Sequence, residues 1–299
     1  MIPSVPHGFE QTISKPRLDS YRGYFRASLS EAIGLYMWNA EVASKLGVLV
    51  SFFEIALRNN IHKTMSSFYS RGSQTSSHWY DTIREQLKPT TRDKIAAVRA
   101  KSRHASPDEI VSRVTFGFWP AILSSLDRRY QAQLLSGIFP NHPLNAAPQN
   151  WSVQTNRASA LAYIYELNEL RNRLAHHEPL WKFSAIKDTS TRPAMIVVRA
   201  SQSQTDTLVR FQRLMGLLDD GMAALNARLQ TDLAESSWRQ ELNFLLSERG
   251  IERYRKLGHV PSANALTPRE FKRQFGVLSR RNQPVRIRNA KHAGVFRPD

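Results

Sequence analysis

Residues 152–179 read SVQTNRASALAYIYELNELRNRLAHHEP, and this stretch decides the fold class and contains the candidate site. Apolar side chains recur in it at spacings of four, three and four residues, at Tyr163, Leu167, Leu170 and Leu174. This spacing predicts an amphipathic helix with one buried stripe. Pro179 ends the helix because a proline pushes the preceding residue out of the helical region. His176 and His177 should lie in the last turn, where unpaired carbonyls and the helix dipole favour a protonated imidazole.

Helical periodicity also dominates the rest of the chain. Ser28 and Glu31 fit a capping box that opens a helix, and residues 46–65 are so rich in apolar side chains that they predict a buried central helix. Residues 106–109, Ser-Pro-Asp-Glu, are typical of a helix start. Residues 192–199 form the one plausible strand. The sequence therefore predicts an all-α fold, a helical bundle with a helical C-terminal extension and a basic tail.

Changes in composition divide the chain into three parts. Residues 1–26 contain prolines and serines and are interpreted as an N-terminal arm, residues 27–230 as the helical domain, and residues 231–299 as the extension and tail. Residues 251–299 carry 12 of the 42 basic residues and only 3 acidic ones. We interpret the tail as an RNA-binding segment; the alternative is a solvated, partly disordered terminus.

The composition limits the classes of partner. The 42 Lys and Arg residues against 25 Asp and Glu residues give a net charge of +17, which favours binding to a polyanion such as nucleic acid. The alternative is a basic surface with no specific ligand. The chain has no cysteine, which excludes disulfides and thiolate zinc sites and favours the cytoplasm. No signal sequence and no run of about 18 apolar residues is found, so neither export nor membrane insertion is expected.

The residue types at the end of the 152–179 helix suit metal-free cleavage of RNA. Arg171 would neutralise the phosphate, and His176 would act as general base on the ribose 2′-hydroxyl or as general acid to the leaving oxygen. Asn172 would orient His176 or donate to the phosphate. On a regular helix Arg171 and His176 point about 140° apart. Joint action on one phosphate would require a distorted last turn or two copies facing each other, so a homodimer is expected.

The same residues also have alternative interpretations. The helix end could simply be exposed, with His176 capping carbonyl groups. Glu178 beside two histidines suggests a metal, but adjacent helical residues point apart and no His-Glu-x-x-His spacing occurs, so neither a metal nor another cofactor is expected. Several aromatic residues could stack on bases but are better explained as core residues, and these are Phe116, Phe118, Trp119 and Tyr163. Tyr165 is placed instead at the edge of the site.

Four segments carry a resemblance to a known family. They are residues 32–39 AIGLYMWN, residues 53–62 FEIALRNNIH, residues 114–119 VTFGFW and residues 171–180 RNRLAHHEPL. In this order they resemble the Abi-like proteins, the abortive-infection family of phage-defence factors within the HEPN superfamily of helical RNA-processing domains. The similarity covers about residues 17–225.

The resemblance implies a helical bundle that dimerises so that two Arg-x4-6-His motifs line one cleft. It assigns Arg171, Asn172 and His176 as the catalytic motif, and His177 also lies within the permitted spacing. The implied activity is a metal-independent endoribonuclease that leaves 2′,3′-cyclic phosphate ends and acts as a toxin or abortive-infection effector. A small non-coding RNA or a protein antitoxin is the expected restraining partner.

Further basic residues are candidate contacts to RNA. Glu54, Arg58 and His62 lie at i, i+4 and i+8, so they form one stripe of their helix. Arg58 and His62 could contact RNA, but we favour the alternative that Glu54 and Arg58 form a buried salt bridge that fixes helix packing. The other candidates are Arg173, Arg280, Arg281, Arg286 and Arg288.

Two rival functions come from other classes. A non-catalytic RNA-binding protein would hold a structured small RNA intact through its basic tail. A DNA-binding regulator is less well supported, because no helix-turn-helix signature is found. Competition between RNA and DNA for the protein at matched salt separates the DNA-binding regulator from the RNA-binding functions. The phosphate groups contribute to binding of both nucleic acids, so any remaining preference shows which of them the protein recognises.

Overall fold

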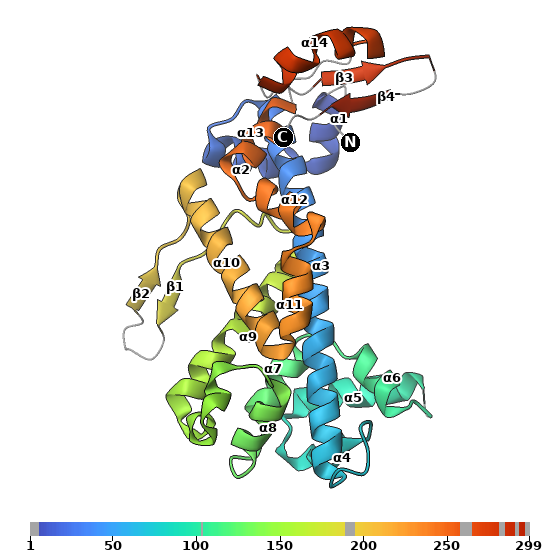
Figure 1. The fold of residues 1–299 in the computed structure, drawn as a ribbon, viewed down its shortest axis with the longest axis vertical. Helices are drawn as coiled ribbons and strands as arrows, with labels where there is room; N and C mark the ends of the chain where they lie inside the picture. The colour runs from blue at the N-terminus through green and yellow to red at the C-terminus, as the bar shows by residue number, and fades with distance from the viewer. Residues whose placement is uncertain are drawn as a thin grey trace. The chain divides into compact units, whose positions relative to one another are not determined.

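The computed structural model describes residues 6–102, 104–188, 195–257, 265–280, 285–290 and 293–296. Helices make up most of these residues, so the predicted all-α fold is confirmed (Figure 1). The chain forms two compact units. The first unit contains Met1–Lys45, His177–Arg213 and Ser237–Asp299, and the second contains Leu46–His176 and Leu214–Ser236. The predicted boundaries at residues 26 and 230 stay predictions.

Helix α3 (Leu29–Tyr69) runs for 41 residues and contributes to both units. The predicted capping box is confirmed, because the Ser28 amide donates to Glu31 Oε2 at 2.7 Å and the Glu31 amide to Ser28 Oγ at 3.3 Å. These two bonds satisfy amide groups that have no partner within the helix. The two helical stretches expected before and after residue 45 are one continuous helix.

The first unit begins with two helices where the sequence suggested an arm. Helices α1 (Pro6–Ile13) and α2 (Lys15–Phe25) precede α3, and α2 buries Leu18, Tyr21 and Phe25. These widely spaced apolar residues attach α2 to the core of the first unit, and the assignment of residues 1–26 as a separate arm stays a prediction. The other helices of this unit are the start of α10 (Gln204–Leu225), α12 (Ser237–Leu245), α13 (Glu248–Leu257) and α14 (Pro268–Arg280).

Trp181 occupies the centre of the first unit's aromatic core. Its ring lies 5.1 Å from Tyr21, 4.4 Å from Tyr24 and 5.4 Å from Phe25, measured between centroids. Trp38 on α3 is buried nearby and donates its indole N–H to the Leu245 carbonyl at 2.8 Å. Pairs of aromatic rings stabilise a core beyond the area they bury, so this cluster fixes the chain just after α9.

Two short antiparallel hairpins complete the first unit. Strands β1 (Ile186–Asp188) and β2 (Met195–Val198) form one, and β2 confirms the predicted strand. Strands β3 (Val285–Arg288) and β4 (Ala293–Phe296) form the other, with Val285 opposite Phe296. These described segments of the tail are therefore folded, in contrast to the alternative of a solvated, partly disordered terminus. Phe296 lies 4.8 Å from Phe271 and 5.4 Å from Phe275 on α14, measured between ring centroids.

The second unit is built around the C-terminal half of α3. Its helices after α3 are α4 (Trp79–Thr82), η1 (Arg84–Gln86), α5 (Pro89–Lys101), α6 (Pro107–Arg113), α7 (Phe118–Ser124), α8 (Gln131–Ile138), η2 (Pro143–Ala146), η3 (Pro148–Ser152), α9 (Gln154–Ala175), the end of α10, and α11 (Ala227–Ala234). Within this unit, α4 to α8 surround the end of α3 (Figure 1).

The core of the second unit contains the aromatic residues that the sequence assigned to it. Phe116, Phe118 and Trp119 are at most 1% exposed, so their interpretation as core is confirmed. Tyr163 on α9 lies 6.0 Å from Phe53 on α3 between ring centroids. A Cβ atom at Gly221 of α10 would lie 2.6 Å from the Tyr163 ring and 3.0 Å from the Phe53 ring, so only glycine allows this close approach.

Candidate active site

The motif helix α9 ends at Ala175, directly before the two histidines. His176 occupies the C-cap, and its amide donates to the Asn172 carbonyl at 3.0 Å. His177 follows with a φ of 53°, in the left-handed region that non-glycine residues rarely adopt. This reversal is a common way to end a helix, although glycine is the usual residue there. The predicted end of the helix is therefore confirmed to within one residue.

Two hydrogen bonds within the first unit hold the chain after α9. Arg17 donates from Nη2 to the His177 carbonyl at 3.1 Å. The Leu180 amide donates to Oδ1 of the buried Asn39 at 2.8 Å. Leu180 and Trp181 are themselves buried. The backbone conformation of His177 is thus supported by contacts on its C-terminal side, as a strained residue requires.

The candidate catalytic side chains are accessible to solvent. Asn172, His176 and His177 are exposed, and Arg171 is half-buried. Within the described ranges, neither imidazole takes part in a hydrogen bond or an ion pair. Imidazoles without a protein partner can exchange protons with a bound molecule. This exposure is compatible with the acid–base chemistry that the sequence predicts for this helix end.

Arg171 interacts electrostatically with Glu54 of helix α3, so it belongs to a small group of charges. Burial raises the pKa of the Glu54 carboxyl, and the guanidinium groups of Arg171 and then Arg58 oppose part of that rise. We call Glu54, Arg58 and Arg171 the α3–α9 charge cluster. It has one more positive than negative charge, so Glu54 does not cancel the cationic character needed beside a phosphate.

His62 is not placed to contact RNA, which corrects the sequence-based assignment. Its side chain is buried, with Nδ1 2.9 Å from the donating Trp79 indole nitrogen and Nε2 3.0 Å from Ser76 Oγ. Ser76 in turn donates to Asp108 at 2.8 Å, so the imidazole donates from Nε2 and accepts at Nδ1. Burial lowers the pKa of His62, and the Asp108 carboxylate opposes that shift. His62 is a structural residue.

The remaining candidate RNA contacts are distributed over both units. Arg173 on α9 is half-buried and has a partner, so it is not simply available for ligand binding. Arg280 is exposed at the end of α14 and donates to the Gly276 carbonyl. On strand β3, Arg286 is half-buried and Arg288 is exposed. Arg281 lies outside the described residues.

A group of polar residues along α9 and the segments around it was not among the candidate site residues identified from the sequence. These are Lys94, Arg128, Gln131 and Arg157. The spacing of Arg157, Leu161 and Tyr165 at four and four residues was visible in the sequence and places them on one face of α9. The partners of that face come from distant segments and could not be found from spacing alone.

Possible metal ligands are dispersed among the described residues. Among the described residues, no three His, Asp or Glu side chains come together as ligands of an ion. The group at the end of α9 consists of the half-buried guanidinium of Arg171, the exposed amide of Asn172 and two exposed imidazoles. Separately, no helix within the described ranges combines the length and the apolar character needed to cross a bilayer.

The fold and the helix end define a class of protein: an all-α protein with an Arg-Asn-x-x-x-His sequence at the exposed end of a long helix. The model of the Abi-like protein family matches residues 6–182 of this chain. Since the match covers more than half of its length, the chain belongs to the Abi-like protein family. No curated protein and no solved structure matches it.

Proposed function

We propose that this protein is a metal-independent endoribonuclease of the HEPN type that acts as an abortive-infection effector. The observation that carries the proposal is the exposed end of α9, where Arg171, Asn172 and His176 lie in a chain of the Abi-like family. The net charge of +17 supports a polyanionic substrate. The site suits RNA because the ribose 2′-hydroxyl supplies the nucleophile.

In the proposed reaction, His176 takes the proton of the 2′-hydroxyl, and the 2′-oxygen attacks the neighbouring phosphorus. The bond from phosphorus to the 5′-oxygen breaks, and that oxygen receives a proton from a second imidazole. His177 or the His176 of a second copy would supply this proton. Arg171 neutralises the charge that develops on the phosphate, and Asn172 orients His176 or donates to the phosphate. The products are a 2′,3′-cyclic phosphate and a 5′-hydroxyl.

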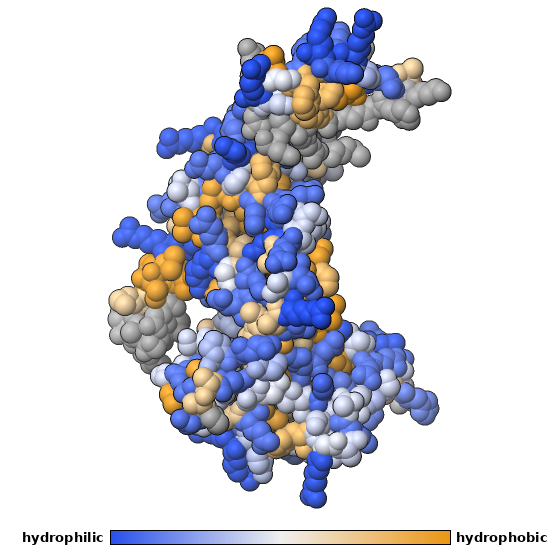
Figure 2. All heavy atoms as spheres, viewed as in Figure 1, coloured by the Kyte–Doolittle hydropathy of each residue, from blue (hydrophilic) through white to orange (hydrophobic). Residues whose placement is uncertain are grey.

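A second copy of the chain is the occupant we propose for an exposed apolar stripe on α3. Val48, Phe52 and Ile55 are each 40–42% exposed and lie on one face of the helix. Figure 2 shows apolar side chains at the surface over the middle of α3. Arg58 lies one turn beyond Ile55, so pairing through this stripe would bring two charge clusters together. Such pairing would overcome the angular separation of Arg171 and His176.

The oligomeric state tests the proposed dimer. We expect the wild-type protein to be a dimer by sedimentation and the Phe52→Glu variant to be a folded monomer with little activity. Val209→Glu is the matched control, because Val209 is an exposed valine on another helix, α10. A monomeric wild-type protein with full activity would exclude the dimer.

Incubation of the purified protein with total RNA in the presence of a chelator tests the function itself. We expect fragments with 2′,3′-cyclic phosphate and 5′-hydroxyl ends, and DNA of the same sequence should remain intact. Loss of cleavage on addition of chelator would contradict a metal-free mechanism. Undiminished cleavage by a purified His176→Ala, His177→Ala double variant would contradict the assignment of the site.

The second candidate function is RNA binding without turnover, favoured by the exposed arginines of the folded tail. Arg280 and Arg288 are exposed on α14 and β3. A small RNA held there could also restrain a ribonuclease, as a protein antitoxin could. Purification of the wild type and of an Arg280→Gln, Arg288→Gln variant tests this function. Equal amounts of intact small RNA with both proteins would argue against the tail as the binding segment.

A further inference from the structure

A pocket of about 630 Å³ opens between α7, α8 and the N-terminal half of α9. Its lining comes entirely from the second unit and includes residues from all three helices and from the α7–α8 loop. The volume lies within the range of about 300–1,000 Å³ that is usual for small-molecule sites. The pocket does not include the residues of the motif.

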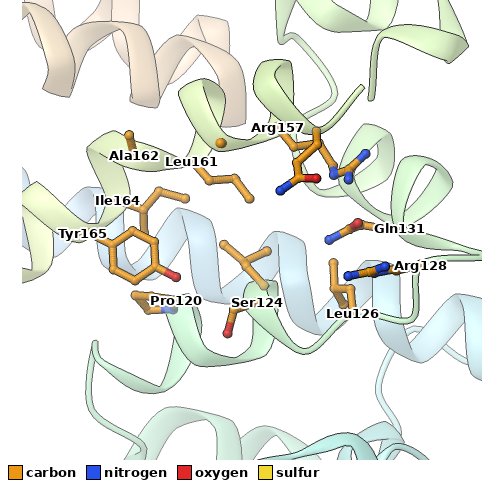
Figure 3. Close-up of a pocket in the computed structure, with 13 residues that line it drawn as sticks. Pro120, Ser124, Leu126, Arg128, Gln131, Arg157, Leu161, Ala162, Ile164 and Tyr165 are labelled. Carbon is orange, nitrogen blue, oxygen red and sulfur yellow. The ribbon is translucent and has the colours of Figure 1, made fainter. Parts of the chain in front are cut away.

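The two ends of the pocket differ in chemistry (Figure 3). One end gathers the cationic and amide side chains of Arg128, Gln131 and Arg157, and the other end gathers Pro120, Ile164 and Tyr165. No carboxylate is among the lining residues. The pocket therefore suits a ligand with an anionic end and a flat apolar end, which is the chemistry of a nucleoside phosphate.

The cationic end is partly organised in advance. Arg157 Nη1 donates to the Trp151 carbonyl at 2.7 Å, which orients the guanidinium and leaves its other N–H groups for a ligand. Arg128 is exposed and has no hydrogen bond or ion pair within the described part of the chain. Its neighbour Arg129 instead forms an ion pair with Asp127 at 2.6 Å. Of these two adjacent arginines, only Arg128 lines the pocket.

The same face of α9 continues from the pocket to the motif. Leu161, Tyr165, Asn168 and Asn172 follow one another at spacings of four, three and four residues, which places them along one face. The distance along the axis from Tyr165 to Asn172 is about 10 Å at 1.5 Å per residue. Lys94 adds a positive charge beside this path: a Cβ at Gly117 would lie 3.7 Å from Lys94 Nζ and 3.5 Å from Asn168 Oδ1.

We propose that this pocket binds one nucleotide of the RNA strand near the cleaved linkage and thereby determines the sequence preference. Arg128 and Arg157 contact its phosphate, and its base lies against Tyr165, which is 54% exposed. The intervening strand follows the α9 face past Lys94 to Asn172. This inference rests on the proposed ribonuclease function, since it specifies which part of the same substrate binds where.

Binding of nucleoside monophosphates tests the pocket without relying on cleavage. We expect AMP, GMP, CMP or UMP to bind the full-length protein in calorimetric titrations more tightly than the matching nucleoside or inorganic phosphate does. Arg128→Gln should weaken that binding about tenfold, because it removes a charged hydrogen-bond donor. Arg129→Gln removes the same charge from the adjacent position and should leave the affinity unchanged. Equal affinities for both variants would overturn the proposal.

A second measurement distinguishes the RNA strand from a free nucleotide as the ligand. We expect Arg128→Gln in a His176→Ala background to weaken binding of a short RNA by the same factor as binding of the monophosphate. Loss of monophosphate binding alone would overturn the strand assignment. Tyr165→Leu should weaken RNA binding about tenfold, whereas Tyr165→Phe retains the stacking surface and should bind normally.

The cleavage pattern separates failure of this proposal from failure of the ribonuclease function. In a protein with His176 intact, Arg128→Gln should still cut RNA but with a relaxed preference at one position beside the cut. Cleavage with an unchanged preference would overturn the pocket's role and leave the ribonuclease function standing. Nucleotide binding that depends on Arg128, in a protein that cuts no RNA, would overturn the ribonuclease function and with it the substrate assignment.

Discussion

Two histidines of the second unit, His62 and His176, occupy opposite kinds of environment. His62 is buried on α3, and both ring nitrogens have partners within 3.0 Å. His176 is exposed at the end of α9, and its imidazole has no hydrogen-bond partner among the described residues. The sequence made His176 a candidate catalytic residue and His62 a candidate contact to RNA. Their environments give one a structural role and leave the other available for chemistry.

The hydrogen-bond partners of a histidine determine its role more than the residue type does. An imidazole that accepts from Trp79 and donates to Ser76 cannot change protonation without breaking one of those bonds. An imidazole with no protein partner keeps its ring nitrogens available to a bound molecule. Variants at the two positions should therefore separate activity from stability.

The largest expected effect is the loss of RNA cleavage in His176→Ala. A general acid or base contributes roughly 10²- to 10⁴-fold, so the cleavage rate should fall by that factor while the thermal midpoint stays within experimental error. His177→Ala should have a smaller effect if His177 does not supply the second proton. Both rates are measured on a short fluorescent RNA with equal amounts of folded protein.

The reverse result would assign the opposite roles to the two histidines. A large loss of stability in His176→Ala with normal cleavage would mean that this histidine, like His62, serves the fold. Comparable loss of cleavage in His176→Ala and His177→Ala would instead indicate that the two histidines share the acid and base roles.

Arg171→Lys extends the test to the partner of His176 and should have the next largest effect. A lysine keeps the charge of the α3–α9 charge cluster but loses the planar pair of donors. We expect cleavage to fall roughly 10²-fold, as for removal of one donor to a developing negative charge. Arg129→Lys, at an exposed arginine outside the motif, is the matched control, and an equal loss there would show that the position of the donor is unimportant.

The sequence was sufficient for features that depend on neighbouring residues. The capping box at Ser28 and Glu31 and the end of α9 before Pro179 follow from interactions over three or four positions. The apolar spacing of α9 correctly placed Leu167 and Leu170 in the core. Local chemistry determines these features, so spacing predicts them.

Features that depend on distant segments could not be predicted in this way. The partners of His62 are Ser76, Trp79 and Asp108, and no periodicity connects them to α3. The pocket along α9 needs Arg128 from another segment. In strand β3, apolar and basic residues alternate over only four positions, which is too short a pattern to predict a strand. In each case the role of the residue or segment depends on a partner that is distant in the sequence.

His62→Ala should reduce stability and leave the chemistry intact, which is the opposite of His176→Ala. The change removes the acceptor of the buried Trp79 indole N–H and should lower the free energy of unfolding by about 1–3 kcal/mol. Cleavage per folded molecule should stay near the wild-type value. Urea unfolding measures the stability, with Lys63→Ala at the next, exposed position as control. An unchanged free energy of unfolding would remove His62 from the fold-stabilising residues.

The smallest expected effect is the pH dependence that His62 gives to stability. Burial holds the pKa of folded His62 below its ordinary value of about 6.5, and the neighbouring His78 lowers it slightly while Asp108 raises it. The unfolded chain therefore binds the proton more readily than the folded one. The stabilising contribution is fully present above about pH 6.5 and is lost as the pH falls through the lower, folded-state pKa.

The slope of stability against pH measures this contribution. One group can change the free energy of unfolding by at most about 1.4 kcal/mol per pH unit, and His62→Gln should remove its share of the slope between pH 7.5 and 5.5. Burial also lowers the pKa of His142, but that histidine is present in both proteins and cancels in their difference. An unchanged slope in His62→Gln would remove His62 as a source of the pH dependence.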